Sequence, residues 1–559
     1  MDPFRLQKAE TLRTRGRIPY AAKFPRTHAL GTAKDAKDGT RAHIAGRVML
    51  WRDMGKMTFA TLQDHTGRLQ VAFREDILGG DGYKDALALI DLGDIIGIEG
   101  ERFTTQAGEP TVLARTWTML TKTLRQPPEK WHGLADQETA WRQRYIDLST
   151  HPEVLERFTF RSLFIRKLRE FYWSRDFIEV DTPVLVNAAS GALAKPFRTH
   201  HDAYDMDVFL RIAPETFLKE CLVGGFDRVF EIARVFRNEG LDPSHLQDFT
   251  MAEHYAAYWD EEENMAFTEE MFVTLLKELR GSLQLQIPDR DGALQSVDFE
   301  TPWPRFTVRE VIERDAGIDI DTCATAEALR KAIHGKGITL DVPVEKLGRG
   351  TLMDQLYKKV SRPKITQPTF IVGHPIDLSP LARRNDVHPD VTDRFQLVLG
   401  GWEIVNAYSE IIDPRDQAQR FEEQAKIHAQ GDVEAHRKDD EYVAALAYGC
   451  PPCSGWGLGV DRIVALFTQQ RNLRDVVLFP LMKPRGEQSE LSVTPGKTEK
   501  TQKTQRKNSS GSSESFESPD SLGSISHSPP ASPNPQLLQH TTYGHLLPAA
   551  HGLLMEHAK

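Results

Sequence analysis

Apolar and polar residues alternate along five short segments between residues 41 and 122. A period of two places successive side chains on opposite faces of a strand, and polar turns such as 64–67 separate the segments. Beyond them, apolar residues recur at spacings of three and four, which predicts an amphipathic helix that ends near Arg175. The residues that carry this helical spacing are Leu155, Phe158, Ile165, Leu168 and Tyr172.

The later part of the chain mixes both periods. Residues 177–185 read as a strand interrupted by Pro183, which restricts it to a sheet edge or a junction between chains. The pattern then predicts helices over about 261–280, 307–360, 414–430 and 439–448, strands from 367 onward, and a glycine-rich turn at 455–459 that opens into a strand or helix.

Two strands at 228–237 and 249–258 depart from the usual pattern of a hairpin. One face of each strand mixes arginine, glutamate and aromatic residues where an apolar stripe is expected. Buried charges are costly unless they are paired or bind a ligand. The hairpin is therefore either a salt-bridged surface element or a site for an anionic ligand beside a cationic one.

The five N-terminal strand segments are typical of a small closed barrel of the oligonucleotide-binding (OB) type. Such barrels stack unpaired bases on aromatic rings and read base edges with polar side chains, for which Phe59 and Gln70 are candidates. A basic arm, residues 1–40, precedes the barrel and is either solvated or in contact with phosphates.

Composition narrows the class of protein. The 559 residues are 40% hydrophobic and 27% charged, and the net charge of −10 does not indicate a dedicated nucleic-acid binder. No run of about 18 apolar residues predicts a membrane span, and the N-terminus lacks the apolar core of a secretion signal. Residues 487–559 are rich in Lys, Gln, Ser and Pro and are expected to be disordered.

Four cysteines in a chain of this length argue against a disulfide framework and for a reducing compartment. Cys450 and Cys453 have the spacing of half a metal site, but Cys221 and Cys323 are isolated and provide no second pair. Two incidental thiols are favoured over a metal or redox site.

Three stretches in order resemble the motifs of class II aminoacyl-tRNA synthetases. They are the helix 155–174 with the strand at Pro183, the charged hairpin RVFEIARVFRNEG…H…FTMAEHY, and GWGLGVDR ending at Arg462. The chain is most similar to the bacterial-type lysyl-tRNA synthetases, over about residues 1–485. This similarity rests on the stretches RLQKAETLRTRGRIPYAAKF, MGKMTFATLQD, DLGDIIG, KWHGLADQE, RQRYIDL, IAPETFLK and SPLARRN.

The resemblance implies an α+β fold with an N-terminal OB-type barrel and a catalytic domain whose antiparallel sheet is flanked by helices. The expected divisions are 1–40 for the arm, 41–124 for an anticodon-binding barrel, 125–150 for a linker, 151–486 for the catalytic domain and 487–559 for the disordered tail.

The family's motifs also assign roles at the nucleotide. Arg237 would contact the α-phosphate and the amino-acid carboxylate, for which a bidentate guanidinium is suited. Glu239 would bind the adenine amino group, and His245 the outer phosphates. Phe249 would stack on one face of the adenine ring, and the catalytic Arg462 would lie on the other face of that ring. Magnesium would be held by Glu403 and Glu410, because Mg²⁺ prefers hard oxygen ligands that bridge to phosphates.

Lysine would be recognised by acidic and aromatic groups, since its ammonium needs a carboxylate or a hydroxyl. The resemblance assigns the lysine pocket to Gly191, Glu215, Glu253, Tyr255, Asn406, Tyr408 and Glu410. It assigns anticodon reading to Phe59, Gln70 and Glu109. Val405, Ala407, Leu193 and Lys195 depart from the commonest pattern and put the tightness of the pocket in question.

The sequence thus predicts a cytoplasmic, homodimeric lysine–tRNA ligase that uses ATP, lysine, Mg²⁺ and tRNA(Lys) and does not associate with membranes. Two alternatives remain open. One is a lysine ligase that modifies a protein, of the elongation factor P type, although that paralogue lacks the barrel. The other is an inactive tRNA-binding paralogue, against which the intact motif residues argue.

Overall fold

The computed structural model describes residues 1–126, 136–192, 194–240, 242–289, 292–345, 347–429 and 439–484. The tail predicted to be disordered, 487–559, lies outside these residues, as does Leu193. Among the described residues, no helix is at once long enough and apolar enough to cross a membrane.

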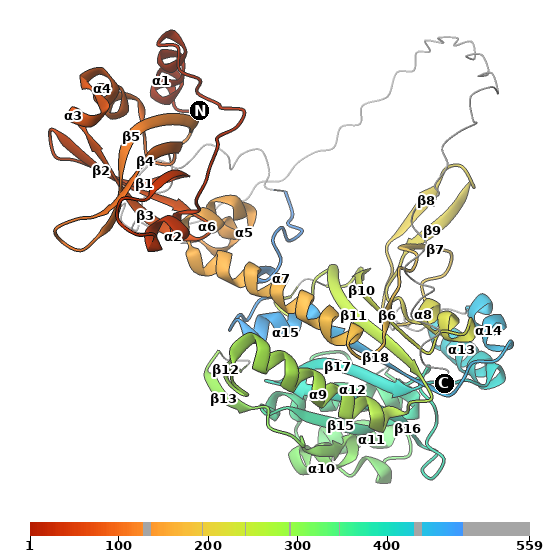
Figure 1. Ribbon diagram of the computed structural model, residues 1–559. Coiled ribbons are helices and arrows are strands. Elements are labelled where there is room, and N and C mark those ends of the chain that lie inside the picture. The colour runs from red at the N-terminus through yellow and green to blue at the C-terminus, as the bar shows by residue number, and fades with distance from the viewer. Residues whose placement is uncertain are drawn as a thin grey trace, which may run out of the picture. The chain divides into compact units, whose positions relative to one another are not determined.

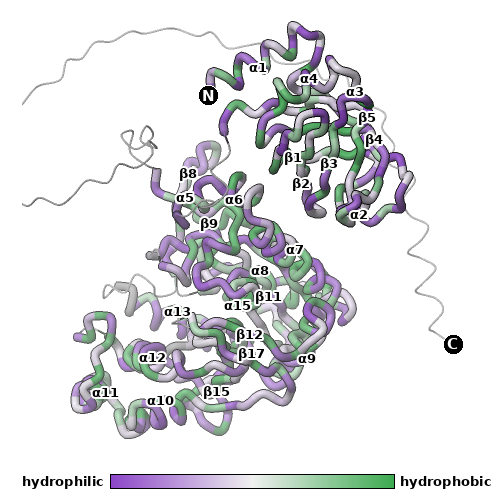
Figure 2. Tube along the Cα trace, turned by 90° about the vertical axis from the view of Figure 1, so that its left-hand side faces the viewer, coloured by the Kyte–Doolittle hydropathy of each residue, from purple (hydrophilic) through white to green (hydrophobic). Residues whose placement is uncertain are grey.

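The predicted N-terminal barrel is confirmed. Its strands close in the order β1-β2-β3-β5-β4, and alternate residues of each strand fill the interior, as a half-buried sheet requires. Hydrophobic stretches recur along these strands and along α7 (Figure 2). The elements are β1 (Arg41–Asp53), β2 (Met57–Asp64), β3 (Gly67–Arg74), β4 (Ile95–Thr104), β5 (Pro110–Thr121), α1 (Pro3–Thr14), α2 (Leu30–Asp35), α3 (Glu75–Leu78) and α4 (Gly80–Leu89).

Half of the predicted linker is helical and packs on the C-terminal part of the described chain. Residues 136–150 include α5 (Gln137–Arg142) and α6 (Arg144–Thr150). The indole of Trp141 donates to Asp475 Oδ1 at 2.8 Å, and Arg144 Nη2 donates to the carbonyl of Arg474 at 2.7 Å. These residues therefore belong structurally with the second domain, whose boundary the sequence placed at residue 150.

An eight-stranded, mostly antiparallel sheet forms the centre of the second domain (Figure 1). Its order is β14-β15-β16-β17-β18-β11-β10-β6. The strands are β6 (Ile178–Glu179), β10 (Arg228–Phe236), β11 (Asp248–Ala257), β14 (Arg305–Thr307), β15 (Thr369–Pro375), β16 (Val391–Leu399), β17 (Trp402–Ser409) and β18 (Cys453–Gly459).

The two faces of this sheet have different neighbours. Helices α7, α9 and α15 cover one face and form the main hydrophobic core with Phe230, Leu397 and Leu458 (Figure 1). Helices α10, α11 and α12 cover the β15–β16 end of the other face, and α8 covers its β10–β11 end. The middle of this second face is left for a cavity. These helices are α7 (Pro152–Trp173), α8 (Glu215–Val223), α9 (Glu261–Arg280), α10 (Val308–Ala316), α11 (Ala326–Gly335), α12 (Arg349–Val360) and α15 (Val460–Phe467).

The helix predicted from residues 155–172 forms as α7, and three of the five residues that predicted it contact the core. Leu168 and Tyr172 are buried there and Ile165 packs against it, whereas Leu155 and Phe158 stay partly exposed and are not part of this core. Phe164 and Phe171, which the prediction did not name, complete the buried face.

Pro183 separates two short strands, as a residue without an amide hydrogen is expected to do. Strand β6 joins the main sheet parallel to β10, whereas the next strand joins a separate three-stranded sheet in the order β7-β9-β8. The remaining elements are β7 (Leu185–Val186), β8 (Arg198–His201), β9 (Met206–Leu210), β12 (Gln284–Pro288), β13 (Leu294–Asp298), α13 (Pro414–Ala429) and α14 (Asp440–Leu446).

Candidate active site

A cavity of about 1140 Å³ lies over the middle of the main sheet. Its size exceeds that of most drug-sized sites and suits two ligands side by side. Strand β11 and the segment that follows β10 provide much of its wall, through Arg237, Phe249 and Glu253. In the register, Glu231 of β10 lies opposite Glu253, but it does not line the cavity, and Arg211 neutralises its carboxylate at 2.7 Å. The charged face of the hairpin therefore serves both the cavity and a buried ion pair.

Strand β18 lines the cavity with glycines, which leave its backbone uncovered by side chains. Its residues Gly455, Gly457 and Gly459 alternate along the strand and line the cavity, whereas Leu458 between them faces the core. A Cβ on Gly455 would overlap the ring of Tyr255 and the carboxylate of Glu410. The glycine-rich pattern therefore lets ligands and side chains approach the backbone closely.

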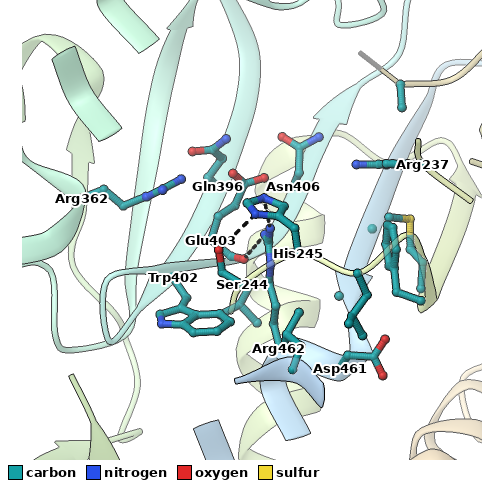
Figure 3. A pocket seen from close by; sticks show the side chains of 18 of the residues that line it. Arg237, Ser244, His245, Arg362, Gln396, Trp402, Glu403, Asn406, Asp461 and Arg462 are labelled. Carbon is teal, nitrogen blue, oxygen red and sulfur yellow. Dashed lines mark hydrogen bonds between the residues drawn. The ribbon is translucent and has the colours of Figure 1, made fainter. Parts of the chain in front are cut away.

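Arg237 lies at one side of the cavity and Arg362 at the other (Figure 3). The Arg237 guanidinium carbon is 5.2 Å from the centroid of the Phe249 ring, and its Nε donates to the carbonyl of Ile212 at 3.3 Å. Burial lowers the pKa of Arg237, while the carboxylates of Glu239 and Glu253 act in the opposite direction. An arginine stays charged in such a site and can bind an anion.

Between these arginines, Arg462 links the end of β18 to the neighbouring strand β17. It is the third residue of α15, where the glycine-rich strand ends, and its Nη1 donates to the carbonyl of Glu403 at 2.9 Å (Figure 3). Its Nη2 lies 3.4 Å from Nε2 of His245, whose Nδ1 is 2.7 Å from Asp242. These contacts fix the guanidinium at the cavity before any ligand binds.

Glu403 is the acidic group at this cationic end. Burial raises the pKa of its carboxyl, but the nearby cations outweigh burial and lower the pKa below its ordinary value. The cations are, in order of effect, Arg462, Arg362, Lys358 and Arg394. An ionised carboxylate surrounded by four cations marks a place where a polyanion can bind and where a cation can bridge it to the protein.

Three of these cations, Lys358, Arg362 and Arg394, were not predicted from the sequence. They come from the end of α12, the segment after it, and β16, and no motif marks their positions. Two buried polar atoms of the cavity wall, Arg362 Nε and Gln396 Oε1, have no hydrogen-bond partner among the described residues. Such atoms are the ones a polar ligand satisfies.

The other end of the cavity is acidic and aromatic. Glu215, Glu253, Tyr255 and Tyr408 all line it, and the Tyr408 hydroxyl donates to Glu215 Oε1 at 2.6 Å. Burial, followed by the charge of Glu215, raises the pKa of Glu253 well above its ordinary value, although Arg237 opposes this. A ligand ammonium at this end would relieve the cost of the buried carboxylate.

Lys219 is a further group that was not predicted from the sequence, because a lysine on a helix more often lies at the surface. It is buried beneath the acidic end, and its Nζ is 2.7 Å from Glu215 Oε1 and 2.5 Å from Glu410 Oε2. Glu410 does not line the cavity, whereas Glu403 does. The predicted magnesium pair is therefore divided between the cavity wall and an internal ion pair.

Gly191 and Asn406 lie where the sequence predicted them, on the cavity wall. Gly191 has φ of 88°, and a Cβ there would come within 2.9 Å of Glu215 Cβ, so the loop needs a glycine. Val405 and Ala407 are buried in the core on the opposite face of β17. Their departure from the commonest pattern therefore concerns core packing and not the cavity surface.

All the predicted catalytic-domain residues except Glu410 line one cavity. They are Gly191, Glu215, Arg237, Glu239, His245, Phe249, Glu253, Tyr255, Glu403, Asn406, Tyr408 and Arg462. In the barrel, Phe59 on β2 and Gln70 on β3 are half-buried diagonal neighbours, since Thr61 pairs with Gln70. Glu109 is exposed in the β4–β5 turn, two residues before the partner of Gln70 on β5.

The family model of class II tRNA synthetases (D, K and N) matches residues 136–483, and the model of the OB-fold nucleic acid binding domain matches residues 42–120. The chain belongs to this family of class II synthetases and is an aminoacyl-tRNA ligase.

Within the family, the chain is similar to proteins named lysine–tRNA ligase. The protein of Pelotomaculum thermopropionicum is 44% identical over 484 residues, which cover 86% of this chain and 94% of that protein. The heat-inducible lysine–tRNA ligase of Escherichia coli K12 is 43% identical, with 86% and 96% covered. That of Thermosipho africanus is 40% identical, with 89% and 98% covered.

Proposed function

We propose that the protein is a lysine–tRNA ligase, which activates lysine with ATP and transfers it to the 3′ end of tRNA(Lys). The observation that carries this proposal is the division of one cavity into a cationic end, around Arg462 and Arg362, and an acidic end with Glu215 and Glu253. A nucleotide triphosphate and a side-chain ammonium need these opposite charges, and the names of the relatives agree with the assignment.

In the first step, lysine's carboxylate attacks the α-phosphate of ATP and pyrophosphate leaves. Arg237 feels the charges of both Glu403 at the cationic end and Glu253 at the acidic end, which supports a role in holding the attacking carboxylate and the α-phosphate together. Arg462 and His245 would neutralise the outer phosphates, while Phe249 stacks on adenine and Glu239 accepts from its amino group. Catalysis then consists of positioning and charge neutralisation, and no side-chain nucleophile is needed.

In the second step, a terminal hydroxyl of the tRNA attacks the adenylate carbonyl and releases AMP. The barrel residues Phe59, Gln70 and Glu109 are proposed to bind the anticodon. Their position on one side of the barrel supports this, because an aromatic ring beside polar groups is what reads an unpaired base.

Magnesium fits the cationic end through Glu403, whose carboxylate is ionised and faces the cavity. Among the described residues no group of three His, Cys, Asp or Glu side chains could hold a metal by itself. Mg²⁺ is usually bound by one or two carboxylates together with substrate phosphates, and when bound it would neutralise phosphate charge. Glu410 would have to leave Lys219 to act as the second ligand.

A homodimer and a cytoplasmic location are part of the proposal. Apolar side chains that adjoin Pro183 in the sequence are exposed, and a second copy could cover them. They are Ile178, Val184 and Leu185. Light scattering of purified protein tests the dimer, and replacement of Leu185 by glutamate should shift the mass toward the monomer.

Pyrophosphate exchange with the purified protein and each amino acid in turn is the decisive experiment. We expect exchange with lysine only; exchange with aspartate or asparagine alone would refute the assignment. Absence of any exchange would instead favour the inactive paralogue. A protein-lysine ligase would show lysine exchange without charging tRNA(Lys), so that aminoacylation separates this alternative, against which the barrel argues.

A further inference from the structure

The Cys450–Pro–Pro–Cys453 segment is a sequence motif that the proposed function does not use. It connects α14 to β18, the strand whose glycines line the cavity. The two sulfurs are 3.8 Å apart, and both thiols are free. In a disulfide the S–S bond is about 2.05 Å long, so that an approach of roughly 1.8 Å separates the pair from a covalent bond.

We propose that Cys450 and Cys453 form a reversible disulfide in response to oxidised small-molecule thiols, and that this bond weakens binding at the acidic end of the cavity. The proposal rests on the assignment of that end to lysine. It concerns a site of covalent modification outside the cavity wall, because neither cysteine lines the cavity.

The two thiols differ in the way that thiol–disulfide exchange requires. Cys450 is half-buried and reachable, whereas Cys453 is buried. The hydrogen bond between the thiols lowers the pKa of Cys450, and Lys219 lowers it further; the same hydrogen bond and burial raise the pKa of Cys453. Cys450 is therefore the attacking thiolate and Cys453 the resolving thiol.

The reaction balances with a small-molecule disulfide as the oxidant. The Cys450 thiolate attacks one sulfur of that disulfide, which releases a small thiolate and leaves a mixed disulfide on Cys450. Cys453 then gives its proton to the released thiolate and attacks Cys450 Sγ, displacing the second small thiolate, which takes up from solvent the proton that Cys450 had lost. Two protein thiols are oxidised, one small disulfide is reduced to two thiols, and excess reduced thiol reverses both steps.

Movement on oxidation falls mainly on Cys450. Cys453 is held in the sheet, where it pairs with Ala257, and its carbonyl accepts from the amide of Glu410 at 2.9 Å. Cys450 lies in the connecting loop, directly after Gly449, whose φ is 105°. Drawing its sulfur toward Cys453 removes it from its contacts with neighbouring side chains.

Those neighbouring side chains belong to the back of the acidic end. Cys453 packs in one apolar cluster with Tyr255, and Cys450 contacts both this cluster and a second one that contains Tyr442 and adjoins Tyr408. Tyr255 and β18 are in close contact, because Gly455 has no room even for a Cβ beside the Tyr255 ring. Closely packed interiors transmit such shifts, so the aromatic and acidic groups in front are displaced.

The test uses the full chain equilibrated in buffers of reduced and oxidised glutathione, followed by alkylation and peptide mass spectrometry. We expect an intramolecular Cys450–Cys453 bond, a rise in KM for lysine of roughly tenfold, equivalent to about 1.4 kcal/mol, and a KM for ATP that changes less than twofold. Dithiothreitol should restore the original values.

Cys450→Ser should abolish the response while keeping the activity of the reduced protein. Cys221→Ser, which removes the third thiol near this cluster, and Cys323→Ser, in a separate cluster, should both retain the response. Absence of the bond in the most oxidising buffer, or a bond that leaves KM for lysine unchanged, would overturn the proposal. Failure of the lysine assignment is recognised separately, because the reduced protein would then show no lysine-dependent exchange.

Discussion

Replacing Glu253 with glutamine separates the two ends of the cavity. The side chain keeps its shape but loses the charge that is proposed to bind lysine's ammonium. Glu253 is only 5% exposed, and its carboxylate faces Tyr255, whose hydroxyl is 3.4 Å from Oε2. Hydrogen bonds to charged groups contribute about 1.5–3 kcal/mol. The KM for lysine should therefore rise roughly 10- to 150-fold, since about 1.4 kcal/mol corresponds to a factor of ten.

Lysine-dependent pyrophosphate exchange measures this effect, with each substrate varied while the other is saturating. The KM for ATP should change little, because the triphosphate is proposed to bind around Arg462 and Arg362. Glu261→Gln is the matched control: Glu261 is a half-buried glutamate whose pKa is also raised by burial, but it does not line the cavity. Equal increases in both KM values would show that Glu253 is structural and that the reasoning is wrong.

The same substitution is expected to change the stability of the protein in a pH-dependent way. Burial and the neighbouring Glu215 and Glu231 raise the folded-state pKa of Glu253, against the opposing charges of Arg237 and Lys219. The protonated carboxyl stabilises the folded protein relative to its ionised form. This contribution to the free energy of unfolding is fully present below the pKa of the unfolded chain, about 4.3, and is lost as the pH rises through the raised pKa of the folded protein. Without ligand, the melting temperature of Glu253→Gln should exceed that of the wild type at neutral pH.

This advantage should shrink as the pH falls and should disappear below about 4.3, because the carboxyl is then largely neutral in both the folded and the unfolded chain. Each unit of pKa difference corresponds to about 1.4 kcal/mol. Differential scanning fluorimetry across this range measures the effect. A difference in melting temperature that does not depend on pH would contradict the assignment of the raised pKa to Glu253.

Three further variants test other parts of the structure. Phe59→Ala should lower the rate of tRNA charging while pyrophosphate exchange is unchanged; unaltered charging would remove Phe59 from the anticodon site. Gly455→Ala should cost about 1–3 kcal/mol in chemical denaturation, because its Cβ would overlap Tyr255 and Glu410, and wild-type stability would contradict this packing. Lys219→Met should cost about 3–5 kcal/mol, since it leaves two buried carboxylates without their cation; a loss below about 1 kcal/mol would mean that the ion pair is dispensable.

Local patterns were sufficient where the structure depends on local alternation. The five barrel strands follow from their period of two, and the helix at 261–280 forms at the predicted residues as α9. Local residues set both ends of this helix. Asp260 and Glu263 form a capping box at its start, and Gly281 adopts the left-handed conformation after its last turn. The charged face of the 228–257 hairpin likewise identified one wall of the cavity.

Tertiary structure decided what alternation could not. Glu403 and Asn406 are an odd number of residues apart and in a regular strand would point to opposite faces. A register shift between β16 and β17 inserts one extra residue, so that both line the cavity while Val405 remains in the core. A shift of this kind depends on the partner strand and leaves no periodic signal in β17 itself.

The sequence by itself determined the two domains and the hairpin of mixed charge, and it pointed to twelve of the residues that line the cavity, because motifs and periodicity are properties of neighbouring positions. Only the tertiary structure brought in the distant cations Lys358, Arg362 and Arg394, and buried Lys219 against Glu410. Charges interact through space with a strength set by distance and burial, and neither quantity can be obtained from spacing along the chain.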